Sequence, residues 1–226
     1  MPVADYATYL ADVCAALRAH WPENRTVNVV CHGHSVPAGY FATPYVDTFD
    51  AYPHLLHVGL KQRFPYAVAN VIVTAIGGES SASGAARFES EGLCHRPDVL
   101  TIDYGLNDRG LGLAVARASW LSMIEAALGR GAKVILLTPT PDVTQLPEGA
   151  TAERAPLQEH AAQIRELAAA YGLGLADSLA ECEAYVAQPG HHLTDLLSWC
   201  NHPNRAGHEL VARALLRYFP AANGLP

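Results

Sequence analysis

The sequence predicts an α/β fold in which helices cover both faces of a parallel sheet. Five short apolar segments are typical of strands, and stretches with helical spacing of apolar residues alternate with them along the chain. The strands are apolar at successive positions, so both of their faces should be buried. Such strands in alternation with helices indicate a parallel α/β sheet.

The elements follow one another without a repeat, a low-complexity tract or an evident linker. Strands are predicted at residues 26–31, 67–76, 97–104, 133–138 and 173–176. Helices are predicted at residues 5–20, 47–64, 111–128, 151–171 and 204–218. Pro53 should lie in the first turn of its helix or kink it, and Thr151 is a candidate N-cap. We therefore expect one domain over residues 1–226.

Composition and charge narrow the range of partners. The chain has a formal net charge of −7, and no stretch concentrates lysine and arginine. Nucleic acids and anionic membranes are therefore not expected as partners, because both need clustered positive charge. No apolar run approaches the ~18 residues that span a bilayer, and the N-terminus does not resemble a signal peptide. The five cysteines are scattered without metal-site spacing, so we expect reduced thiols in a cytoplasmic protein.

Ligands of parallel α/β sheets bind beyond the carboxyl ends of the strands, so the loops at those ends are the first places to search for a site. Three such loops, and a fourth segment just before the last helix, carry residues suited to chemistry. These segments are 32–37 (HGHSVP), 77–81 (GGESS), 105–108 (GLND) and 201–208 (NHPNRAGH). Each is weak evidence alone, but their occurrence together and in this order predicts an active site.

The four segments supply the parts of a serine hydrolase. Ser35 is a candidate nucleophile, and it needs a positioned base because serine alone is weakly nucleophilic. His202 is the candidate base. Gly78 can expose a backbone N–H and Asn107 a side-chain amide, which together would form an oxyanion hole. The first segment is not the nucleophile elbow of α/β-hydrolases, since Pro37 stands where that motif has its second glycine.

This order of serine, glycine, asparagine and histidine resembles the SGNH/GDSL hydrolase family, over residues 27–216. The resemblance implies a flavodoxin-like three-layer α/β/α sandwich with a five-stranded parallel sheet. It also implies that Ser35 is the nucleophile and His202 the base. The oxyanion hole would combine the N–H groups of Ser35 and Gly78 with the amide of Asn107. No metal or organic cofactor is implied.

Two positions depart from the family pattern. His34 replaces the aspartate of the Gly-Asp-Ser motif, so the local hydrogen bonds must differ. Trp199 stands three residues before His202, where the family has the aspartate that orients the base. A backbone carbonyl near Trp199 would give a Ser–His dyad, or Asp195 would supply the carboxylate. The third alternative is a weakened or non-catalytic relative.

The sequence predicts hydrolysis of short-chain carboxylic esters through an acyl-enzyme. No long apolar insertion suggests a lipase lid, and O-acetyl groups on a carbohydrate are one candidate substrate. His34, Tyr40, Arg109 and Trp199 are candidates for the substrate pocket. A non-catalytic binding domain on the same scaffold is the alternative function. A zinc site at His32 and His34 is a further alternative, but no other ligand cluster follows at metal-site spacing, and we predict no metal.

Overall fold

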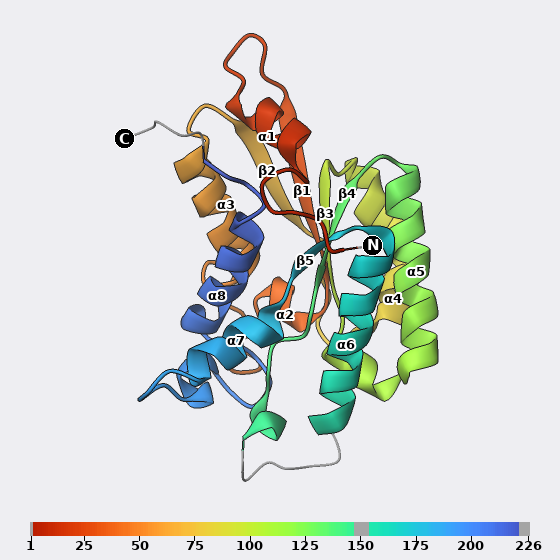
Figure 1. The fold of residues 1–226 in the computed structure, drawn as a ribbon, viewed down its shortest axis with the longest axis vertical. Coiled ribbons are helices and arrows are strands. Elements are labelled where there is room, and N and C mark those ends of the chain that lie inside the picture. The colour runs from red at the N-terminus through yellow and green to blue at the C-terminus, as the bar shows by residue number, and fades with distance from the viewer. Residues whose placement is uncertain (1, 147–153, 222–226) are drawn as a thin grey trace.

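A computed structural model describes residues 2–146 and 154–221 (Figure 1). It contains a five-stranded sheet in the order β2-β1-β3-β4-β5, and every pair of neighbouring strands is parallel. The strands are β1 (Thr26–Gly33), β2 (Val68–Val73), β3 (Val99–Asp103), β4 (Lys133–Leu137) and β5 (Gly174–Ala176). This is the flavodoxin-like order, so the predicted fold class is confirmed.

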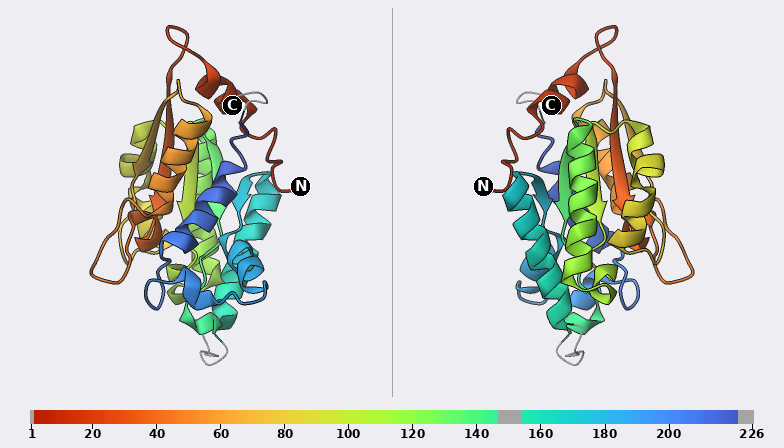
Figure 2. Two further views of the ribbon diagram at one scale, coloured as in Figure 1. Left: turned by 90° about the vertical axis from the view of Figure 1, so that its left-hand side faces the viewer. Right: turned by 90° about the vertical axis from the view of Figure 1, so that its right-hand side faces the viewer.

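Helices form the two outer layers of the sandwich. The first layer contains α1 (Ala11–Arg18), α3 (Tyr52–Arg63), α7 (Ser178–Val186) and α8 (Arg205–Leu216). The opposite layer contains α4 (Ser81–Arg87), α5 (Leu113–Gly129) and α6 (Arg154–Tyr171). Figures 1 and 2 show the sheet between these layers. The buried apolar side chains form two clusters, one against each face of the sheet.

The predicted elements differ from the structure in places. The first helix is confined to α1, and the second strand is shorter and half-exposed because β2 lies at the edge of the sheet. Pro53 lies in the first turn of α3, which is one of the two alternatives expected for it. Thr151, the candidate N-cap, lies outside the described residues. Three helices had no counterpart in the predicted elements: α2 (Ser35–Ala38), α4 and α7.

Among the described residues no helix is both long and apolar enough to cross a membrane.

Candidate active site

Ser35 lies immediately beyond the carboxyl end of β1. The strand ends at Gly33, where an added Cβ would lie 2.5 Å from the carbonyl oxygen of Asp103, so only glycine fits. Ser35 then begins α2, a single turn over Ser35–Ala38, and its side chain is almost fully buried. The strand and the turn together fix the hydroxyl at the edge of the sheet.

His202 contacts Ser35 from the other end of the chain. Its Nε2 lies 2.9 Å from Ser35 Oγ, although the two residues are 167 positions apart. The loop is held by Ser198, whose backbone N–H and hydroxyl both donate to the His202 carbonyl at 3.0 Å. The side chain of Asn204 then caps α8. The predicted serine and histidine therefore come together in the fold.

The Nδ1 atom of His202 has no hydrogen-bond partner of normal geometry among the described residues. Burial lowers the pKa of His202 below its ordinary value of 6.5, and the proximity of the His34 ring acts in the same direction. The backbone carbonyl of Phe41 opposes this shift, so this carbonyl lies beside the ring. The imidazole is therefore neutral near pH 7 and able to accept a proton.

The structure does not bring Asp195 to His202. The carboxylate of Asp195 accepts a hydrogen bond from the His192 N–H at 2.8 Å and closes a capping box at the turn Leu193–Leu196. Trp199, at the family's aspartate position, has 64 % of its surface exposed. The nearby backbone carbonyl comes from Phe41 rather than from the neighbourhood of Trp199. The Asp195 carboxylate is used for capping within its own loop and does not extend to His202.

Gly78 and Asn107 lie in adjacent loops beyond β2 and β3. Gly78 has φ +80°, a left-handed conformation that favours glycine, and the side-chain amide of Asn107 donates to the Glu79 carbonyl at 2.8 Å. Neither Gly78 nor Ser35 uses its backbone N–H in a hydrogen bond to another described residue. One amide hydrogen of Asn107 is also left over, so three donors remain for a ligand.

Two charged residues fix these loops to the core. Arg87 in α4 forms an ion pair of 2.6 Å with the Glu79 carboxylate and donates to the Thr74 carbonyl at 2.6 Å. Asp108 is fully buried and accepts hydrogen bonds from the Ser81 N–H at 2.8 Å and from the Trp120 indole at 2.7 Å. Burial raises the pKa of Asp108, and these hydrogen bonds oppose the rise. Neither contact was predicted from the sequence.

His34 takes over a structural task at the position of the family aspartate. Its Nδ1 accepts a hydrogen bond from the Val36 N–H at 3.2 Å, which caps α2. The ring is fully buried, so His34 lies beneath Ser35 rather than in an open pocket. Its Nε2 approaches Asp103 Oδ1 to 3.4 Å. Asp103 was missed in the sequence, although it is the one charged residue of the buried strand β3.

The remaining pocket candidates occupy different surroundings. The Tyr40 ring lies 6.0 Å from the His202 ring and packs over Gly77, where an added Cβ would lie 2.7 Å from it. Arg109 forms an ion pair of 2.6 Å with Asp142 and lines a hollow of about 280 Å³ beside Asn107. Tyr40 is therefore placed to contact a ligand at His202, and Arg109 a ligand at Asn107.

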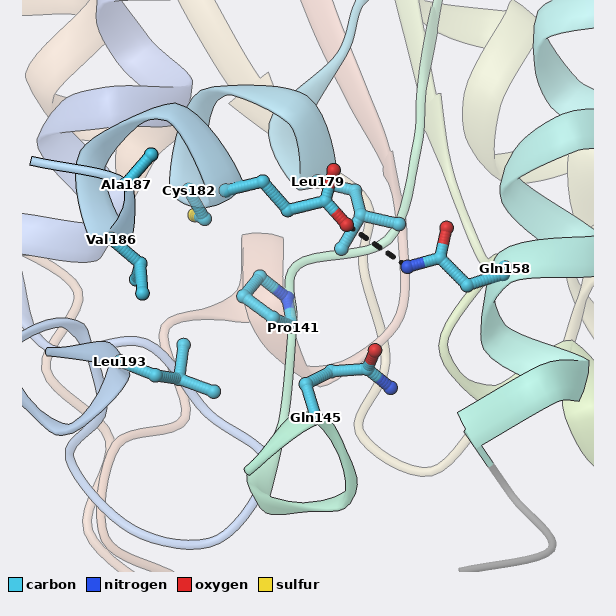
Figure 3. A pocket seen from close by; sticks show the side chains of 9 residues that line it. Pro141, Gln145, Gln158, Leu179, Cys182, Val186, Ala187 and Leu193 are labelled. Carbon is cyan, nitrogen blue, oxygen red and sulfur yellow. Dashed lines mark hydrogen bonds between the residues drawn. The ribbon is translucent and has the colours of Figure 1, made fainter. Parts of the chain in front are cut away.

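Figure 3 shows a second hollow, of about 450 Å³, between α7 and the loop after β4. Leu179, Cys182, Val186 and Leu193 give it an apolar wall. Gln158 donates a hydrogen bond of 3.0 Å to Glu183 across one side. None of the described residues that line it is Ser35, Asn107 or His202.

The two histidines of the HxH pair point to different partners. His32 Nδ1 lies 2.8 Å from the Thr74 hydroxyl and Nε2 lies 3.1 Å from the Gly84 carbonyl. Burial lowers its pKa to about 4. His34 instead contacts Ser35 and Asp103. Within residues 2–146 and 154–221, no group of three or more His, Cys, Asp or Glu side chains is placed to hold a metal ion.

Solved structures with a similar fold are hydrolases. Axe2, an acetylxylan esterase from Geobacillus stearothermophilus, matches as a catalytic mutant with a TM-score of 0.73 and 19 % identity, over 90 % of this chain and 97 % of that chain. LAE5, an alpha/beta hydrolase from the Lake Arreo metagenome, has a TM-score of 0.69 and 22 % identity, over 88 % and 97 % of the chains. A lipase/acylhydrolase from Enterococcus faecalis has a TM-score of 0.68 and 24 % identity, over 84 % and 94 %.

At these identities the likeness shows the fold alone. No curated protein matches this chain. The model of the GDSL-like Lipase/Acylhydrolase family matches residues 31–210, which is most of the chain and includes all four segments of the site. The chain therefore belongs to the GDSL-like lipase/acylhydrolase family.

Proposed function

We propose that this chain is a serine ester hydrolase in which Ser35 is the nucleophile and His202 the general base. Family membership supports an ester hydrolase. The observation that carries the assignment of residues is the 2.9 Å contact between Ser35 Oγ and His202 Nε2. A general base must lie within hydrogen-bond reach of the proton that it abstracts, and this contact meets that requirement.

The reaction proceeds through an acyl-enzyme. His202 takes the Ser35 proton while Oγ attacks the ester carbonyl, and the same imidazole then protonates the leaving alcohol. The developing oxyanion is held by the N–H groups of Ser35 and Gly78 and by the free amide hydrogen of Asn107. Water attacks the acyl-enzyme in the second half of the cycle, with His202 again the base.

His202 works as a dyad with Ser35 and without a carboxylate on its Nδ1. The Phe41 carbonyl beside the ring is the group that favours the protonated imidazole, as its effect on the pKa indicates. Asp195 is not required, because its carboxylate is already used by the His192 N–H.

Short acyl esters are the proposed substrates, with O-acetyl groups on a carbohydrate as the first candidates. The similar fold of an acetylxylan esterase supports this choice. The partly buried Tyr40 ring beside His202 supports this choice as well, because a ring at this position narrows the space next to the base.

The test is a panel of p-nitrophenyl esters of increasing chain length, with Ser35→Ala as the control. We expect the highest kcat/KM for acetate and no turnover by Ser35→Ala. A fluorophosphonate probe should label Ser35 in the wild type. Wild-type protein that neither turns over the esters nor reacts with the probe would support a non-catalytic domain instead.

A further inference from the structure

Two imidazole rings, those of His202 and His34, lie close to Ser35 Oγ. His202 Nε2 is 2.9 Å away on the side of the C-terminal loop, and His34 Nδ1 is 3.3 Å away on the side of the core. The His34 ring is fully buried, whereas His202 keeps 5 % of its surface exposed. The two histidines therefore approach the same hydroxyl from different sides, and both are buried.

The tautomer of His34 follows from its contacts. The Val36 N–H donates to Nδ1 at 3.2 Å, so Nδ1 carries a lone pair and the ring proton must be on Nε2. Asp103 Oδ1 lies 3.4 Å from that nitrogen, within ion-pair distance but without the geometry of a hydrogen bond. Asp103, His34 and Ser35 therefore form a carboxylate–imidazole–hydroxyl series in the order of a catalytic triad.

Asp103 is suited to stabilise a positive charge on His34. Its side chain is 96 % buried and has no lysine or arginine partner among the described ion pairs. The other titratable groups around the pair are Tyr52 in α3, Cys31 in β1, Tyr104 after β3 and His202. After burial, the negative charge of Asp103 is the next cause that raises the pKa of Tyr52. A buried carboxylate without a lysine or arginine partner favours a cation beside it.

We propose that His34 is a second general base for Ser35, oriented by Asp103. The proposal rests on Ser35 being the nucleophile, as in the proposed function. Asp103 then orients His34 as the aspartate of a triad would, whereas no carboxylate orients His202. The two histidines then divide the work: His34 exchanges the Ser35 proton, and His202, which keeps a little exposed surface, exchanges protons with water and the leaving group.

The proton path is balanced for esters whose leaving group departs as an anion. The Ser35 O–H bond breaks, its proton bonds to His34 Nδ1, and Oγ bonds to the acyl carbon while p-nitrophenolate leaves. In deacylation His202 takes a proton from water, the hydroxide attacks, and Oγ leaves with the proton that His34 returns. His202 then gives its proton to solvent. An alkyl alcohol must be protonated as it leaves, so for such esters His202 takes the Ser35 proton and passes it to the alcohol.

The competing explanation is that His34 only caps α2. Val36 N–H and Ser35 Oγ share the single lone pair of Nδ1, and the capping hydrogen bond must be given up when Nδ1 is protonated. Asparagine is among the best N-cap residues and can accept from Val36 N–H, but it is not a base. The substitution His34→Asn therefore separates the two roles.

The experiment uses a fluorophosphonate probe, because fluoride leaves as an anion and no general acid is needed. The second-order rate of labelling at Ser35 is measured for wild type, His202→Ala, and His34→Asn with His202→Ala. His57→Asn in α3, combined with His202→Ala, is the matched control. We expect His202→Ala to retain labelling and the added His34→Asn to lower it about 10²-fold, the lower end of general-base effects. The His57→Asn combination should label as His202→Ala does.

Labelling of His202→Ala that is unaffected by His34→Asn would overturn the proposal, and so would complete loss of labelling in His202→Ala alone. Thermal unfolding confirms that each variant is folded. Asp103→Asn with His202→Ala is the second test, since it leaves the cap intact, and it should also slow labelling. Wild type that does not label at all would refute the proposed function itself, which is a distinguishable result.

Discussion

Asn107→Ala tests the oxyanion hole, because this amide has two separable tasks. One N–H donates to the Glu79 carbonyl at 2.8 Å, and the other is left for the substrate. Loss of the first should lower the free energy of unfolding by about 0.5–1.5 kcal/mol. Loss of the second should raise the barrier by about 2.7–4 kcal/mol, which is a fall of 10²–10³ in kcat.

The assay is hydrolysis of p-nitrophenyl acetate, with kcat and KM measured separately and thermal unfolding measured alongside. We expect kcat to fall with little change in KM, since the donor acts on charge that develops in the transition state. Asn70→Ala is the matched control, because Asn70 in the edge strand β2 loses the same amide and one exposed hydrogen bond to Asn28. A folded Asn107→Ala protein with the kcat of this control would refute the assignment.

Three further predictions concern the surroundings of the site. Asp195→Asn should leave kcat unchanged in an ester assay, because asparagine still accepts from the His192 N–H; a loss near the ~10⁴-fold of triad aspartates would contradict the dyad. Asp108→Ala should lower the free energy of unfolding in urea, because the buried N–H donors of residues 81 and 120 lose their acceptor, at about 1–3 kcal/mol each; Asp108→Asn should cost less, and equal costs would contradict this reasoning. The pKa of His202 is lowered and the base must be neutral, so kcat/KM should fall with decreasing pH through a midpoint below 6.5; a midpoint above 6.5 would contradict the burial argument.

Much of the fold could be predicted because its signals are local. Short apolar runs, most of them rich in β-branched residues, indicated the five parallel strands, and helical spacing indicated the long helices. Helices α2, α4 and α7 were missed, and α2 and α4 span only four and seven residues. The N-cap Asp177 was the available signal for α7. The exposure of β2 could not be foreseen, since strand order, and hence which strand is at the edge, is set by tertiary packing.

The site residues divide in the same way, into those with a local sequence signal and those whose surroundings depend on tertiary packing. The segments around Ser35, Gly78, Asn107 and His202 were recognisable because each follows a strand or precedes a helix in a fixed order. The surroundings of His202 were not, because they depend on loop geometry that brings the Phe41 carbonyl to the ring and turns Asp195 away. Contacts across the sheet, such as that of Asp103 with His34, leave little trace in one sequence.

Because His202 must contact Ser35, esterase activity also depends on α8 staying packed against the rest of the fold. His202 lies three residues before this helix, and α8 packs on α3, where the Tyr52 N–H donates to His208 Nδ1 at 3.2 Å. Burial keeps His208 neutral by lowering its pKa to about 3. If α8 opens as a unit, the catalytic pair separates while the sheet remains intact. On warming, esterase activity should then disappear before the circular dichroism of the strands changes.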